Sequence, residues 1–258
     1  MTEQTFNASI PGALLASIRC PQGAVRVAVI SSLTVAQVTV RTKDGSGPTA
    51  DAVRRTRIIQ NGDRLSITVP EVEGTTVIGS TTIRNGGATI IQNFGTIGAD
   101  QSVTGMTIRN GQVIMGGSLS SPVEVVVGLP AGSGVQMESH NADLTVTGVL
   151  AALDFKTHNG SLRAGVVGRV KVRGHNGTND VEAVQEWVDI ETHNGDTEIG
   201  SYSGGAARMR TRNGNIRLSA TPTASGRLEA SAYNGNIRLV GTRHLDVATS
   251  TRNGRVSK

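Results

Sequence analysis

The sequence has few residues that could form disulfide bonds, aromatic stacking contacts or membrane-spanning segments. Its 258 residues include one cysteine, Cys20, which excludes an internal disulfide. We expect this cysteine to be a small buried strand residue rather than a reactive thiol. Aromatic residues make up 2% of the chain, so few flat side chains are available for stacking on sugars or unpaired bases. These shortages argue against a disulfide-stapled fold and against a groove for saccharides or single-stranded nucleic acid.

Long hydrophobic runs are also missing. The segment Met1–Phe6 has no basic residue followed by an apolar run, and Ala13–Ile18 is too short for a secretory signal. No stretch approaches the roughly 20 apolar residues of a membrane-spanning helix. We therefore expect a cytoplasmic protein with no membrane span, and a cell-surface location is the alternative.

Glycine and β-branched residues are abundant instead. The 33 glycines follow no collagen-type period, and together with many Val, Ile and Thr they favour short strands joined by tight turns. Helices are expected to be nearly absent. The hydrophobic fraction of 37% is enough for a core only if that core is thin and continuous.

A four-residue pattern of the type Thr-His-Asn-Gly returns along the second half of the chain. Its asparagines are spaced 18, 17, 18, 19, 21 and 19 residues apart, and glycine follows all but the first. These asparagines are Asn141, Asn159, Asn176, Asn194, Asn213, Asn234 and Asn253. Self-similarity with a period near 20 residues is typical of solenoids.

Hydrophobic residues alternate on both sides of each asparagine. Apolar residues lie six and four positions before it, and three and five positions after it, as Val172 and Ile216 illustrate. Each repeat should form two half-buried strands bent at Asn-Gly, and the parity places every asparagine inward. In parallel coils the asparagines would stack about 4.8 Å apart as a structural Asn ladder joined by amide hydrogen bonds. The alternative, an antiparallel meander with Asn-Gly hairpins, does not explain one asparagine in every unit.

The repeats divide the chain into three regions. Residues 1–70 are interpreted as an N-terminal β cap with starting coils, and one or two helical turns fit 50–56. Residues 71–122 are a Gly/Thr/Ile-rich insertion with its own Thr-Ile-Arg-Asn-Gly repeat, which predicts hairpins or disorder. Residues 123–258 carry the β-solenoid repeats. The predicted fold is all-β: a single-stranded parallel β-solenoid (β-helix) with 17–21 residues per repeat and an irregular N-terminal cap.

Several longer motifs carry a family resemblance. They are the repeated Thr-x-Asn-Gly pattern, Gly23-Ala-Val-Arg-Val27, Asp63-Arg-Leu-Ser-Ile-Thr-Val69 and Pro122-Val-Glu-Val-Val-Val-Gly-Leu-Pro-Ala-Gly132. With these motifs the chain resembles the bacterial putative-adhesin β-strand-repeat family, a domain family of unknown function common in actinobacteria. The resemblance implies a single-stranded β-solenoid similar in plan to the polymer-forming bactofilins, and it implies no enzyme.

The residue before each ladder asparagine is expected to point outward, and these residues define an exposed column. The column consists of His140, His158, His175, His193, Arg212, Tyr233 and Arg252. Imidazoles about 4.8 Å apart could chelate a divalent metal, sense pH, or serve only as flat side chains that keep the coils in register. No carboxylate or cysteine column accompanies them, so we assign no metal or cofactor.

Catalytic patterns do not emerge from the spacing. Acidic residues such as Asp180 and Glu198 form no cluster, and no Ser-His-Asp or Cys-His arrangement is indicated. We therefore expect no enzyme and no catalytic site, with a β-helix enzyme acting on polysaccharides as a minor alternative. The expected function is a non-catalytic β-solenoid scaffold or self-associating interaction protein. A cell-surface adhesin-like binding protein is the main alternative.

Charge is distributed unevenly along the repeats. Residues 135–199 carry 5 basic and 10 acidic side chains, a net charge of −5, whereas 200–258 carry 10 basic and 2 acidic side chains, a net charge of +8. A basic C-terminal patch is expected from Arg208, Arg210, Arg212, Arg217, Arg238, Arg252 and Arg255. Without aromatic partners these arginines predict no sequence-specific nucleic-acid binding. The sequence ends in mid-repeat, so we expect an open edge that self-associates or binds another protein.

Overall fold

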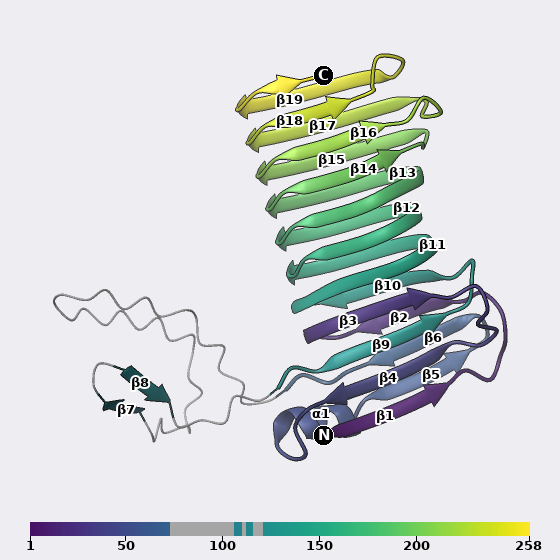
Figure 1. Cartoon of the computed structure of the whole chain (residues 1–258), viewed down its shortest axis with the longest axis vertical. Coiled ribbons are helices and arrows are strands. Elements are labelled where there is room, and N and C mark those ends of the chain that lie inside the picture. Colours follow the sequence, from purple (N-terminus) through teal and green to yellow (C-terminus); the bar gives the residue numbers. More distant parts are fainter. Residues whose placement is uncertain (73–105, 110–111, 116–120) are drawn as a thin grey trace.

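The chain folds into an elongated stack of β-coils (Figure 1). The computed structural model describes residues 1–72, 106–109, 112–115 and 121–258. In the first part the elements are β1 (Thr2–Asn7), β2 (Leu15–Arg19), β3 (Gln22–Val29), β4 (Gln37–Thr42), α1 (Pro48–Arg54), β5 (Arg57–Asn61) and β6 (Arg64–Thr68). The short strands β7 (Met106–Arg109) and β8 (Gln112–Met115) follow.

The second part of the chain contains strands only. They are β9 (Glu124–Leu129), β10 (Gly134–Ser139), β11 (Asn141–Asn159), β12 (Leu162–Asn176), β13 (Asn179–Asn194), β14 (Thr197–Tyr202), β15 (Ala206–Asn213), β16 (Ile216–Ala220), β17 (Arg227–Asn234), β18 (Ile237–Val240), β19 (Asp246–Asn253) and β20 (Val256–Ser257). Among the described residues α1 is the single helix.

The stack is built from parallel pairs between successive coils. β11 pairs with β12, β12 with β13, β13 with both β14 and β15, and the later strands pair two elements apart, as β15 does with β17 and β16 with β18. This pairing confirms the predicted β-solenoid. It also rules out the antiparallel meander for these repeats, because a meander would alternate strand directions.

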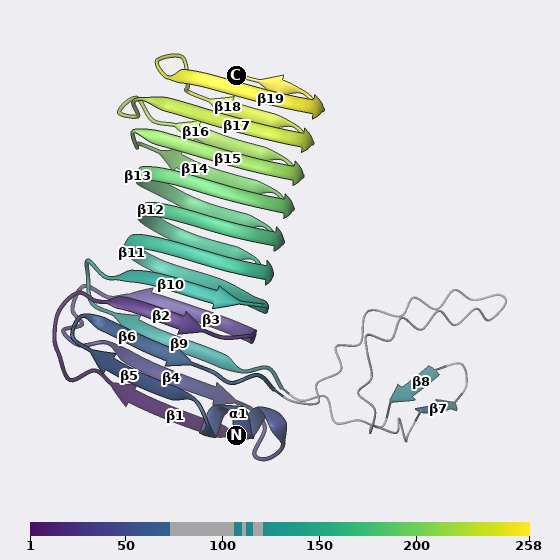
Figure 2. The ribbon, with the colours of Figure 1, turned by 180° about the vertical axis from the view of Figure 1, so that it is seen from behind.

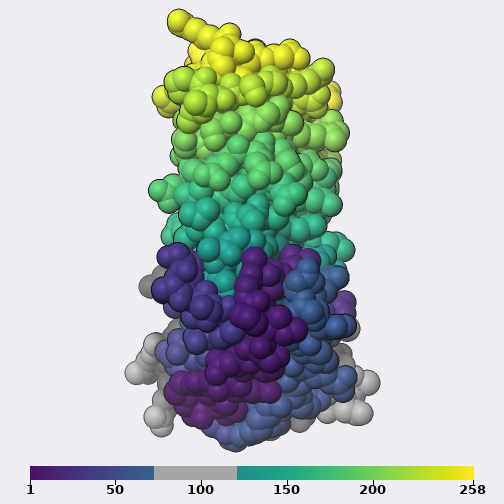
Figure 3. Space-filling model, turned by 90° about the vertical axis from the view of Figure 1, so that its right-hand side faces the viewer, coloured from purple at the N-terminus to yellow at the C-terminus, as the bar shows by residue number. Residues whose placement is uncertain are grey.

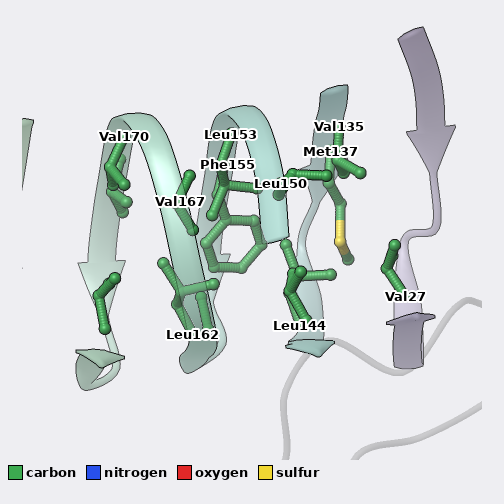
Figure 4. Packing of buried hydrophobic residues seen from close by; sticks show 14 of the residues in the cluster. Val27, Val135, Met137, Leu144, Leu150, Leu153, Phe155, Leu162, Val167 and Val170 are labelled. Carbon is green, nitrogen blue, oxygen red and sulfur yellow. The ribbon is translucent and has the colours of Figure 1, made fainter. Parts of the chain in front are cut away.

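A thin core runs inside the coils, as the hydrophobic alternation predicts. Phe155, Val172 and Ile190 stand in one register column, and each is fully buried. Figure 4 shows the ring of Phe155 between Leu144 and Leu162, which stand opposite each other in successive coils. Each coil alone would leave its apolar face in water, so the stacking of neighbours stabilises the fold.

The N-terminal end departs from the parallel pattern. β4 pairs antiparallel with β9 and β1, and β5 pairs antiparallel with β6. The helix α1 packs beside β1 and β4 at this end (Figures 1 and 2). Figure 3 shows this end as the base of the stack, with the repeats rising above it in sequence order. The sequence patterns did not reveal β1 and β5, because these strands repeat no motif of the later coils.

The parallel stack already begins within the N-terminal region. β2 pairs in parallel with β6 and β10, and β3 pairs in parallel with β9 and β11. β6 stacks on β2 and β9 stacks on β3, and the turn between β2 and β3 is made by Pro21 and Gln22. The segment 70–122, which connects β6 to β9, therefore takes the place of that turn in its own coil. Most of the predicted insertion, including both of its Asn-Gly pairs, lies outside the described residues. Its strands β7 and β8 pair antiparallel, with Arg109 opposite Gln112.

Candidate binding surface

The seven repeat asparagines form one continuous hydrogen-bonded row. From Asn159 onward, each Nδ2 donates to the Oδ1 of the asparagine in the preceding coil, and these six distances are 2.6–2.7 Å. The strands that end at these asparagines terminate along one side of the stack (Figure 1), which we call the turn edge. An amide can donate and accept at once, so one residue type repeats along the whole row.

The predicted inward orientation of the ladder asparagines is wrong. Asn159, Asn194 and Asn213 are exposed, and none of the seven is buried. The inward alternation stops two residues earlier, at buried threonines such as Thr157 and Thr192. The chain then turns, so the last residue before the asparagine and the asparagine itself both lie outside the core. Side chains alternate between the two faces only within a straight strand, so the alternation cannot be extrapolated through a bend.

The glycine that follows each asparagine from Asn159 onward is explained by the close approach of the coils. A Cβ atom on Gly195 would overlap the backbone carbonyl oxygen of Gly177 in the preceding coil. Gly195 also has a φ of +149°, which side-chain-bearing residues rarely adopt. The Asn-Gly pair therefore combines a side chain that links the coils with a residue that lets their backbones meet.

The four histidines of the exposed column stack face to face. Successive ring centroids from His140 to His193 are 5.0, 4.8 and 4.5 Å apart, with interplanar angles of 9°, 6° and 25°. Imidazole lone pairs lie in the ring plane, so the lone pairs of parallel rings do not converge on one ion at the roughly 2.0 Å that zinc requires. The stacked geometry therefore disfavours metal chelation. Further along the column, Arg252 donates to the Tyr233 hydroxyl at 2.7 Å and lies over its ring.

The seven arginines of the predicted basic patch are not brought together. Arg208 and Arg210 point outward from β15, on the strand before the turn, whereas Arg217 and Arg238 point outward from the strands after it, across the core. The remaining three, Arg212, Arg252 and Arg255, lie at the turn edge. Two are partly neutralised, because Arg217 lies 3.4 Å from Glu198 and Arg208 lies 4.0 Å from Glu229. The charge asymmetry along the axis thus exists on several faces rather than as one patch.

Groups suited to catalysis are dispersed over the described part of the chain. There, no three His, Cys, Asp or Glu side chains gather where they could hold a metal ion. Cys20 is fully buried, and burial raises the pKa of its thiol to about 12, so the thiolate is scarce. Of the described helices, none is long and apolar enough to cross a membrane.

Sequence reasoning missed a hollow on the outer face of β13, β15 and β17. Its volume is about 420 Å³, and its lining includes Trp187, Ala206, Arg208, Arg227 and Glu229. We call it the Trp187 hollow. Trp187, Ala206 and Arg227 occupy equivalent positions in three successive coils. The hollow exists because Ala206 is much smaller than the side chains on either side of it. This size difference can be recognised in the sequence only after the repeats are aligned on their asparagines.

Comparisons with known proteins agree with this fold. A putative adhesin from Bacteroides fragilis superposes with a TM-score of 0.53 at 12% identity, covering 99% of this chain and 96% of that one. A putative cell adhesion protein from Clostridium sporogenes (TM-score 0.39, 7% identity, 99% and 97% coverage) and a putative lipid binding protein from Parabacteroides distasonis (TM-score 0.37, 10% identity, 100% and 97% coverage) are more distant. A search of the curated proteins found no match.

A family model described as Toastrack DUF4097 matches residues 28–257. The match begins in β3 and includes β4, β5, β6 and β9 at the base, every Asn-Gly turn and the last strand of the stack, whereas β1 and β2 precede it. Because it spans most of the chain, the protein belongs to the Toastrack DUF4097 family.

Proposed function

We propose that this protein is a non-catalytic β-solenoid scaffold that self-associates side by side through opposite charges. The observation that carries the proposal is a charged column on the outer face of the strands after the turn. It consists of Arg163, Asp180, Glu198, Arg217 and Arg238, which stand opposite one another in five successive coils. All five side chains are exposed, and within the chain Arg163 lies 3.6 Å from Asp180 and Arg217 lies 3.4 Å from Glu198.

The order of these charges is self-complementary. From Asp180 to Arg238 the column reads two acidic and then two basic residues, at a spacing of about 4.8 Å per coil. A second copy turned by a two-fold axis between Glu198 and Arg217 would place its arginines against the acidic residues of the first. Such a two-fold contact uses the same surface on both copies and closes as a dimer. The net charges of −5 and +8 on 135–199 and 200–258 favour the same antiparallel overlap.

Sedimentation velocity tests the scaffold proposal. At tens of micromolar in low salt we expect a dimer, which dissociates as salt screens the charges. Arg238→Glu should weaken the dimer, and adding Asp180→Arg in the same chain should restore it because the pair is exchanged. Arg210→Glu, the same charge change on the other face, is the matched control. A monomer in low salt, or equal effects of Arg238→Glu and Arg210→Glu, would contradict the proposal.

An adhesin-like binding protein at the cell surface is the second candidate. The similar solved structure from Bacteroides fragilis bears the name putative adhesin, which favours this candidate about as well as the charged column favours a scaffold. The two candidates differ in location, so fractionation of the native cells separates them. Recovery of the protein with the envelope, accessible to added protease on intact cells, would favour the adhesin, and recovery in the soluble fraction would favour the cytoplasmic scaffold.

A further inference from the structure

We propose that the Trp187 hollow binds a carboxylate-bearing sugar residue of an acidic polysaccharide. The hollow lies on the face of the strands before the turn, across the core from the charged column of the proposed dimer. The inference therefore goes beyond self-association and does not depend on it.

The shape of the hollow suits a single ring. Ala206 contributes only a methyl group between Trp187 in the preceding coil and Arg227 in the next. At about 4.8 Å per coil, the gap between the flanking side chains is roughly two coil spacings wide. A volume of about 420 Å³ is within the range of small-ligand sites. The hollow is therefore shallow, with the methyl group of Ala206 at its bottom and the ring of Trp187 along one side.

The charges around the hollow leave capacity for one more anion. Arg227 pairs with Glu229 at 2.9 Å, and Arg208 lies 4.0 Å from the same carboxylate. The other acidic side chain of the lining, Asp189, is bound by Arg173 from the preceding coil. Two guanidinium groups thus share one carboxylate, and their side chains are 48% and 61% exposed. A ligand carboxylate can accept paired hydrogen bonds from such groups.

Trp187 offers both an apolar surface and a hydrogen-bond donor. In the described residues no side chain or backbone group accepts a hydrogen bond from its indole N–H, and no cation lies over its ring. The ring is partly exposed, next to the small Ala206. A sugar ring presents an apolar face together with hydroxyl acceptors, which match the two halves of the indole.

An acidic peptide fits this surface less well. Peptides commonly bind β-proteins by adding a strand to an open edge. Here the backbones of β13, β15 and β17 pair with each other across the hollow. A peptide would have to be held by side-chain contacts alone, whereas a single sugar ring can be bound by the Trp187 ring, the Ala206 methyl group and the two arginines.

The sole tryptophan of the chain makes fluorescence a direct test. Titration with a short galacturonic acid oligomer should change the Trp187 emission and saturate, while the neutral galactose oligomer of the same length should have little effect. Arg227→Gln should weaken binding at least about tenfold, because a charged hydrogen-bond partner is lost. Ala206→Leu should abolish binding, because the larger side chain would occupy the hollow between Trp187 and Arg227. Arg238→Gln, on the opposite face, is the matched control and should bind as the parent does.

Three results would overturn the proposal: no emission change up to millimolar oligomer, equal binding by Ala206→Leu, or equal binding of poly-glutamate. Thermal melts of each variant check that the fold is kept. The charge-reversal variant Arg238→Glu, designed to prevent dimerisation, should bind the oligomer like the parent protein. This last measurement separates a failure of the saccharide site from a failure of the self-association proposal.

Discussion

The two edges of the solenoid respond differently to the uneven length of the repeats. At the turn edge every asparagine stands opposite an asparagine, although the intervals vary from 17 to 21 residues. At the opposite edge the register shifts, between Val146 and Val149, between Val167 and Arg169, and between Ile199 and Tyr202. The longest interval adds its residues in the loop at 221–226. The turn edge thus keeps the coils in register while the opposite edge absorbs extra length.

The strongest test of this comparison is one methyl group placed on each edge. We expect Gly195→Ala to lower the free energy of unfolding by about 3 kcal/mol, because the new Cβ would overlap the Gly177 carbonyl oxygen. Gly205→Ala, at the opposite edge, is the control, because its Cβ would meet no atom closer than 3.9 Å. Urea unfolding of both variants measures the difference. Equal losses would show that the edges are not distinct.

Acid should weaken the turn edge where the histidines stack. Two neighbouring rings of this column that both carry a proton, at 4.5–5.0 Å, would repel by roughly 1 kcal/mol per charged pair before salt screening. We expect hydrogen-exchange protection to fall between about pH 8 and pH 5 in the coils of His140 to His193, and less in the Arg and Tyr coils. The double variant His158→Gln/His175→Gln should reduce the change. The same protection profile at both pH values would remove pH sensing.

The exposed position of the ladder sets the size of the next effect. Asn194→Asp removes the Nδ2 donor to Asn176 and places a carboxylate oxygen beside the Asn176 Oδ1. Since Asn194 is exposed, we expect a loss of about 1 kcal/mol rather than the larger penalty of a buried charge. Gln185→Glu is the control, because Gln185 lies exposed on the same strand and its side chain makes no hydrogen bond with the described residues. A loss of several kcal/mol in chemical denaturation would mean that the asparagine row is shielded from water after all.

The smallest effect is expected at the base of the stack, where residues 70–122 replace a turn. The hydrogen bond from Arg41 at 2.7 Å lowers the pKa of Glu124. A carboxyl group with a lowered pKa stabilises the fold above its ordinary pKa, and the contribution disappears as the pH falls through the lowered value. Glu124→Gln should therefore lower the melting temperature slightly at pH 7, and the difference should vanish in acid. A difference that persists in strong acid would point to packing rather than charge.

Much of the candidate surface followed from the repeat, and the rest depended on neighbours in space. Aligning the asparagines was enough to predict which residues share a column, including the four histidines. The alignment could not show that the histidine rings stack face to face, or that the arginines lie on opposite faces. Composition could not reveal the Trp187 hollow, because the hollow depends on Ala206 standing between two large side chains of neighbouring coils.

The architecture follows from local features of the chain: alternation of apolar residues, a period near 20 residues and a recurring Asn-Gly pair predict stacked parallel coils. These are local and periodic properties, so they can be read without knowing the fold. The orientation of the asparagines depends instead on the three-dimensional fold, because the chain bends after Thr157 and Thr192 and the alternation of the strand ends there. The three-dimensional fold likewise decided that β4 and β5 end the parallel stack with antiparallel pairs. Bends and caps depend on contacts between distant segments, and no periodic signal encodes those contacts.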